Sequence, residues 1–175
     1  MKFSTWIALF SQTGSEIIAL SEALNRTPDF VITNSSLDRV NAKIGVDFRL
    51  NNDEAKTLDI LENLEFDINS TLITLNGWLR IVPPDKCLKY NIYNGHPGLI
   101  TKYPELKGKD PQERTWDNLH KYDVIGSVVH QVVEEVDAGE IVAKEFLSSS
   151  SLLTLDDTYR SLRQTSFTAW YSFLK

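Results

Sequence analysis

The N-terminal half of the chain alternates short apolar runs with amphipathic stretches, and this alternation restricts the fold more than any other feature. Apolar runs at residues 3–10, 30–33 and 70–75 are typical of buried strands. Residues 16–24 and 52–64 repeat apolar side chains at helical spacing. The order strand, helix, strand, helix, strand favours parallel pairing with right-handed crossovers. The sequence therefore predicts an α/β fold with a mostly parallel, twisted sheet and helices on both faces.

The C-terminal half predicts a different pairing. Two apolar-rich runs, residues 127–133 and 140–147, are separated by only six residues. This spacing is too short for a helical crossover, so we expect an antiparallel strand addition to the sheet. Thr154 and Asp157 have the spacing of a capping box and predict the start of a final helix. Shorter elements are predicted at 85–89 (a helical turn), 90–94 (a strand) and 148–151 (a serine loop).

Composition restricts the class of protein. The 175 residues show no linker-like shift, so we expect a single domain over residues 1–175. The net charge of −6 makes nucleic acid an unexpected partner and favours small molecules. No apolar run approaches the ~20 residues of a membrane span, and no secretory signal is recognisable, so we expect a cytoplasmic protein without membrane contact. Cys87 is the only cysteine, and no metal site is expected.

Polar residues gather after the predicted parallel strands, where α/β sheets bind ligands. The three loops expected to converge there are residues 11–15, 76–84 and 94–104. Asn94 offers an amide, His96 an imidazole and Asp137 a carboxylate, a set that suits acyl transfer without a covalent enzyme intermediate. Taken alone, His96 fits a structural histidine better than a catalytic one, and Asp137 fits an ordinary turn residue better than a catalytic carboxylate.

Four stretches taken in order give the chain a wider resemblance. They are Asn76-Gly77-Trp78-Leu79-Arg80-Ile81-Val82, Asn94-Gly95-His96-Pro97-Gly98-Leu99-Ile100, Lys102-Tyr103-Pro104, and residues 126–142 with Asp137-Ala138-Gly139. Together they resemble the folate-dependent formyltransferase family, which includes glycinamide ribonucleotide and amino-sugar formyltransferases. The resemblance implies the formyltransferase fold and an N-formyltransferase that moves a formyl group from 10-formyltetrahydrofolate to a primary amine.

The resemblance also implies roles for individual residues. Asn94 would hold the formyl oxygen, His96 would donate a hydrogen bond to that oxygen and transfer protons, and Asp137 would raise the basicity of His96 and help to deprotonate the amine. The implied folate pocket consists of Leu79, Arg80, Ile81, Val82, Val133, Glu134, Glu135 and Val136. The implied acceptor site consists of Ser11, Gln12, Thr13, Gly14, Ser15 and Pro97.

The acceptor site departs from the family pattern. Residues 11–15 contain one glycine where the glycinamide ribonucleotide enzymes have a glycine-rich phosphate loop, and Ser166 falls near the position of an acidic substrate contact. The charged segment 107–121 is either a solvated loop or a clamp on an anionic acceptor. A small nucleotide or nucleotide-sugar amine is the favoured acceptor class. The sequence does not indicate an oligomeric state.

Two other functions fit the same residues. One is a hydrolase that releases formate from 10-formyltetrahydrofolate, and the other is a folate- or nucleotide-binding module without turnover. Of the remaining histidines, His130 is interpreted as a packed strand residue and His120 as an exposed loop residue. Cys87 is expected to be at least half-buried and without a role.

Overall fold

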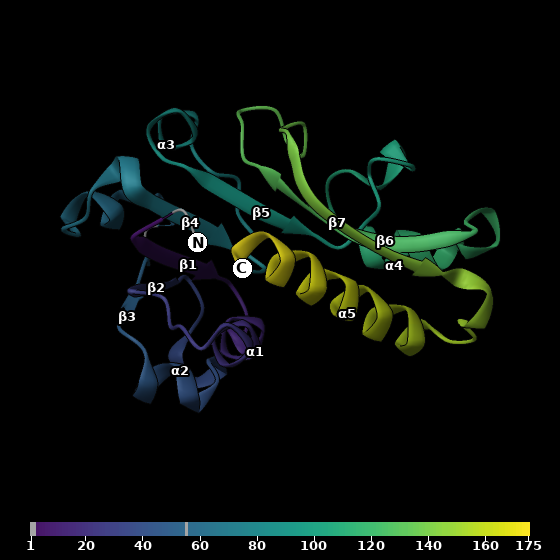
Figure 1. Ribbon diagram of the computed structural model, residues 1–175, viewed down its shortest axis with the longest axis horizontal. Coiled ribbons are helices and arrows are strands. Elements are labelled where there is room, and N and C mark those ends of the chain that lie inside the picture. The colour runs from purple at the N-terminus through teal and green to yellow at the C-terminus, as the bar shows by residue number, and fades with distance from the viewer. Residues whose placement is uncertain (1–2, 55) are drawn as a thin grey trace. The chain divides into compact units, whose positions relative to one another are not determined.

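The computed structural model describes residues 3–54 and 56–175 (Figure 1). Within this part of the chain, seven strands form one sheet in the order β3-β2-β1-β4-β5-β6-β7. The strands are β1 (Thr5–Phe10), β2 (Phe30–Thr33), β3 (Leu50–Asn52), β4 (Thr71–Leu75), β5 (Ile92–His96), β6 (Val124–Gln131) and β7 (Ile141–Ser148). The helices are α1 (Ser15–Leu24), α2 (Ala42–Asp47), α3 (Pro84–Lys89), α4 (Pro111–Asp117) and α5 (Leu155–Leu174).

The strand pairings confirm the predicted fold class. β1 pairs in parallel with β2 and β4, and the pairs β2–β3 and β4–β5 are parallel as well. β6 and β7 are antiparallel, as the short connection between them requires. No helix in the described part of the chain combines the length and the apolarity needed to cross a membrane.

The chain divides into two compact units, which we describe separately. Unit 1 comprises Met1–Asn94 and Gln131–Glu134, and unit 2 comprises Gly95–His130 and Glu135–Lys175. The expectation of a single domain over residues 1–175 stays a prediction.

Unit 1 is built around β1, which lies between β2 and β4 and is almost entirely buried. The indole N–H of Trp6 donates to the hydroxyl of Thr74 over 2.9 Å, so the polar atom of this buried ring is satisfied. One continuous apolar cluster packs on these strands: Ile7, Leu9, Phe30, Ile32, Leu58, Leu61, Ile73, Leu75, Trp78, Val82, Tyr90 and Ile92.

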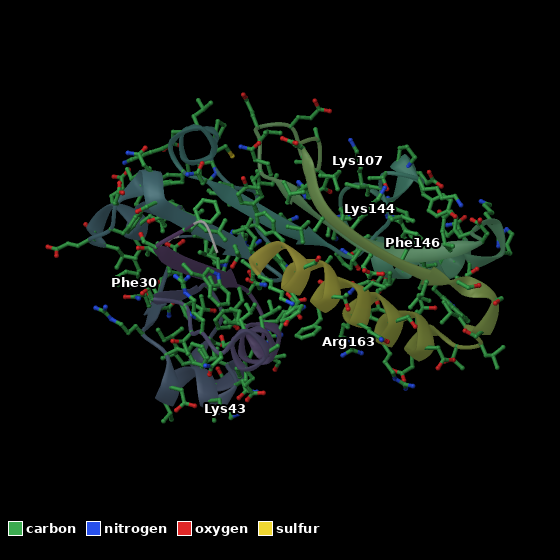
Figure 2. All side chains as sticks on the ribbon, in the orientation of Figure 1. Phe30, Lys43, Lys107, Lys144, Phe146 and Arg163 are labelled. Carbon is green, nitrogen blue, oxygen red and sulfur yellow. The ribbon has the colours of Figure 1, made fainter. Side chains whose placement is uncertain are left out.

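Unit 2 packs α5 along β7 (Figure 1). The Ser127 hydroxyl on β6 donates to the Leu162 carbonyl of α5 over 2.9 Å. The other face of β7 is exposed, and Lys144 and Phe146 project from it (Figure 2). The apolar core of this unit consists of Leu99, Ile100, Leu106, Tyr122, Ile125, Val128 and Leu162.

The prediction of an amphipathic helix over residues 52–64 is wrong. This stretch contains the end of β3 and a short 3₁₀ turn at Asp59–Asn63, and residue 55 lies outside the described residues. Lys56 and Leu58 have left-handed backbone (φ 60° and 62°), and the buried Asp53 carboxylate accepts from the Leu58 N–H over 3.0 Å. This local turn competes successfully with the helix and still buries Leu58 and Leu61.

Segments expected to be loops contain short ordered turns. The serine run forms a 3₁₀ turn at Ser149–Ser151, started by the Ser148 side chain, which accepts from the Ser150 N–H. Residues 107–121 contain α4 and a 3₁₀ turn at Leu119–Lys121. The predicted elements at 85–89 and 90–94 are confirmed as α3 and β5, with bounds shifted by one or two residues.

The predicted capping box at the start of α5 is present and gives a stability test. The Thr154 hydroxyl accepts from the Asp157 N–H over 3.1 Å, and the Asp157 carboxylate accepts from the Thr154 N–H over 3.0 Å. Thr154→Ala should lower the free energy of unfolding by about 1 kcal/mol in urea titrations, because an exposed cap of this type contributes that much. Thr168→Ala, within the same helix, is the control. Equal effects of the two changes would contradict the capping role.

Candidate active site

The end of β5 places a buried histidine beside a buried carboxylate. His96 is 4 % exposed, and its Nδ1 lies 3.3 Å from Oδ2 of Asp137, whose side chain is 8 % exposed. Glycine precedes His96 for a steric reason, since a Cβ at Gly95 would clash with the indole of Trp170 on α5. The spacing Asn-Gly-His thus lets β5 run close to α5 while it delivers the imidazole to Asp137.

Asp137 is held from three directions. Its backbone is left-handed (φ 53°), a conformation that Asp tolerates better than most residues. Its Oδ2 accepts from the Gly108 N–H over 2.7 Å, and its Oδ1 lies 3.3 Å from Nε2 of His130. The carboxylate therefore lies between two imidazoles, those of His96 and His130.

Each ring nitrogen of His96 faces a group that can only accept a hydrogen bond. Nε2 lies 2.9 Å from the Leu106 carbonyl oxygen, and Nδ1 lies 3.3 Å from the Asp137 carboxylate. The doubly protonated ring satisfies both partners, and a neutral ring leaves one of its two nitrogens without a proton.

The electrostatics of the pair follow from this geometry. Burial lowers the pKa of His96 below its ordinary value of 6.5, and the negative charge of Asp137 opposes this effect. Burial alone would raise the pKa of Asp137, but the hydrogen bond from His130, the proximity of His96 and the Gly108 N–H together lower it to about 2. At neutral pH the Asp137 carboxylate is therefore ionised, and the His96 nitrogen that faces it is Nδ1.

Asn94 and Pro97 flank His96 in the chain. Asn94 lies on β5 two residues before His96, so the two side chains leave the same face of the strand. Both Asn94 and Pro97 are half-buried.

Of the residues assigned to the folate pocket, some are exposed and one belongs to the core. Leu79 and Ile81 are 61 % and 76 % exposed, Arg80 is exposed as well, and Val82 is buried in the apolar cluster of unit 1. The other assigned residues, Val133, Glu134, Glu135 and Val136, are all exposed. Leu79, Ile81 and Val133 therefore leave apolar surface open to a ligand.

Within unit 1 the structure brings the loop after β1 next to the segment after β4. The Leu79 N–H donates to the Ser11 hydroxyl over 2.8 Å, and the Ser11 N–H donates to the Gly77 carbonyl over 3.1 Å. In the rest of the loop, Gln12, Thr13 and Ser15 are exposed and Gly14 is buried. The expected convergence is confirmed for these two loops, and that of the third loop, residues 94–104, stays a prediction.

Sequence reasoning missed two parts of this arrangement. His130 is a buried strand residue, as expected, but its contact with Asp137 was not foreseen. The segment Glu105–Gly108 supplies the Leu106 carbonyl and the Gly108 N–H, main-chain groups that leave no signal in side-chain chemistry. The first contact had one weak signal: His130 lies on the first strand of the predicted antiparallel pair, and Asp137 lies in the short connection that follows it.

A sequence profile of the family described as "Formyl transferase" matches residues 6–172, nearly the whole chain. The chain belongs to the formyl transferase family. Among its relatives, the phosphoribosylglycinamide formyltransferase of Dictyostelium discoideum is 33 % identical over 102 residues, 53 % of this chain and 46 % of that protein. The human trifunctional purine biosynthetic protein adenosine-3 is 32 % identical over 159 residues, 78 % of this chain and 15 % of that protein. The matched region thus spans less than half the length of these relatives.

Solved structures support the family fold. The phosphoribosylglycinamide formyltransferase from Bacillus halodurans aligns with a TM-score of 0.79 and 21 % identity, over 97 % of this chain and 93 % of that chain. A formyltetrahydrofolate deformylase from Pseudomonas syringae pv. tomato aligns with a TM-score of 0.72 and 18 % identity, over 97 % and 60 %. At these identities the likeness establishes the fold alone.

The low pKa of Asp137 predicts a pH-dependent stability. A shift from 3.8 to about 2 corresponds to about 2 kcal/mol that is present above pH 5 and lost as the pH falls toward 2. The difference in unfolding free energy between the wild type and Asp137→Asn should therefore shrink from pH 6 to pH 3 in urea titrations. Asp117→Asn, at an exposed position of α4, controls for the loss of charge. A difference that stays constant with pH would contradict the assigned pKa.

Proposed function

We propose that the chain is an N-formyltransferase that uses 10-formyltetrahydrofolate and acts on a primary amine of a small, nucleotide-linked acceptor. The observation that carries the proposal is the buried His96–Asp137 pair, with its ionised carboxylate and the Leu106 carbonyl at Nε2 of His96, in a chain of the formyl transferase family.

The proposed reaction exchanges one carbon–nitrogen bond for another. The donor supplies an activated formyl group, the amine nitrogen bonds to the formyl carbon, and the bond from that carbon to the folate nitrogen breaks. One proton passes from the amine to the departing nitrogen. The amine attacks only in its neutral form, so a group that accepts its proton is required.

Asp137 and His96 divide the proton transfer between them. The ionised Asp137 carboxylate receives the proton of the amine, directly or through water. With a pKa of about 2 it does not retain the proton, and Nδ1 of His96 lies 3.3 Å away to take it. His130 holds the other carboxylate oxygen and so keeps Oδ2 directed at His96.

His96 and Asn94 stabilise the negative charge that grows on the formyl oxygen. The Nε2–H of His96, which donates to the Leu106 carbonyl, is the donor that the formyl oxygen would take over. The Asn94 amide, two residues earlier on β5, supplies a second donor. In enzymes with an oxyanion hole, the loss of one such donor lowers kcat by about 100- to 1000-fold.

The binding of donor and acceptor involves residues of unit 1. The exposed apolar side chains of Leu79 and Ile81 suit the flat ring of a folate. The hydroxyl-rich loop 11–15 precedes the N-terminus of the ten-residue helix α1, where an acceptor phosphate would be favoured. The relatives' names make phosphoribosylglycinamide the first acceptor to test, and an amino nucleotide sugar the second.

Substitution of the pair tests the proposal. His96→Ala and Asp137→Asn should lower kcat by at least about 100-fold, since each removes a group that acts in the transition state, whereas the Kd for a folate donor analogue should change little. Kinetics with each acceptor and equilibrium binding measure the two quantities. His120→Ala, at an exposed histidine of the 3₁₀ turn Leu119–Lys121, is the matched control. Wild-type kcat in His96→Ala would contradict the proposal, and so would formate release that needs no amine.

A further inference from the structure

The guanidinium of Arg114, on α4, binds three consecutive main-chain carbonyls of unit 2. Nη1 donates to the Glu105 oxygen over 2.5 Å, and Nη2 donates to the Leu106 oxygen over 3.1 Å and to the Lys107 oxygen over 2.7 Å. Figure 2 labels Lys107, the last of the three residues. A single side chain thus fixes the conformation of the segment Glu105–Gly108, which we call the strap.

The strap in turn contacts both members of the His96–Asp137 pair. The Leu106 oxygen that Arg114 binds is the oxygen that accepts from Nε2 of His96 over 2.9 Å. One residue beyond the last clamped carbonyl, the Gly108 N–H donates to Asp137 over 2.7 Å. Gly108 has a φ of 83°, a conformation that favours glycine and aims this N–H at the carboxylate.

The environment of Arg114 argues against a different use of its charge. Its Nε is buried and has no hydrogen-bond partner among the described residues. Both terminal nitrogens are occupied by carbonyls, so the guanidinium is not presented to an anionic acceptor. Burying Nε without a hydrogen-bond partner costs free energy of folding. We therefore interpret the three bonds to the strap as the main role of this side chain.

We propose that Arg114 is a positioning residue for formyl transfer, which acts through the strap to keep the Leu106 carbonyl at Nε2 of His96 and the Gly108 N–H at Asp137. The charged segment 107–121 therefore supports the His96–Asp137 pair and is neither an unconstrained loop nor a clamp on the acceptor. The effect on the rate rests on the proposed formyltransferase function, whereas the effect on the hydrogen bond at Nε2 does not.

Nitrogen-15 NMR of the imidazole in the full, donor-free chain tests the hydrogen bond at Nε2. In the wild type, Nε2 of His96 should carry a proton and donate it to the Leu106 carbonyl. In Arg114→Gln the population protonated at Nε2 should fall relative to that protonated at Nδ1, because Leu106 no longer presents a fixed acceptor while the Asp137 carboxylate still faces Nδ1. Arg114→Lys should restore the wild-type signal in part, since one ammonium can bind some of the three carbonyls. Arg160→Gln, which removes an equal charge from an exposed position of α5, should leave the signal unchanged.

Kinetics supply the second readout. Arg114→Gln should lower kcat by about 10- to 100-fold, as expected for a misplaced catalytic group, with a much smaller change in KM. If Arg114→Gln does not fold, Arg114→Lys becomes the test, and both its shift of the proton away from Nε2 and its loss of kcat should be smaller than those expected for Arg114→Gln. A folded variant with the wild-type Nε2 signal and the wild-type kcat would overturn the proposal. If the wild type transfers no formyl group, the proposed function fails, and the Nε2 signal still decides whether Arg114 positions His96.

Discussion

The buried, ionised carboxylate of Asp137 is the interaction on which the rest of the site depends. A carboxylate with 8 % side-chain exposure loses most of its hydration, a cost that is tolerated only when other groups replace the water. Here two imidazoles and one main-chain N–H do so. These contacts outweigh burial, so the group stays charged and orients the histidine on which the proposed chemistry depends.

The main chain sets the position of this pair more than side-chain packing does. Gly95 lets β5 pass the ring of Trp170, and the strap of residues 105–108 supplies one acceptor and one donor. Main-chain groups tied into turns and helix ends move less than long side chains. The Nε2 of His96 is thus held by the main chain, without a second side chain.

The sequence predicts the parts of the fold that depend on local pattern. Each of three elements follows from its own local pattern. A continuous apolar run predicts the strand of Trp6, apolar residues at helical spacing predict the helix of Ile17 and Ile18, and the Thr154–Asp157 spacing predicts the capping box. The region around Leu58 fails because its apolar spacing fits a helix, while Asp53 and two left-handed residues close a turn instead. The Asp53 carboxylate competes with the helix for the Leu58 N–H, and the turn still buries Leu58 and Leu61 in the core.

The candidate site shows the same division. His96 and Asp137 stand in recognisable motifs, and the structure places them together. His130 looks like any buried strand residue until β6 is folded against the turn that bears Asp137, and Arg114 looks like a surface charge because its partners are carbonyls, which every residue has. Contacts to main chain and across long sequence separations have no signature in residue type.

The most direct test of the account is the fate of a carbon-13 label in the formyl group of 10-formyltetrahydrofolate, followed by NMR with an amine acceptor present. The account predicts that the label moves onto the acceptor nitrogen as a formamide, and that His96→Ala abolishes this transfer. Label that appears only as formate, or that remains on the folate with every nucleotide-linked amine, would contradict it.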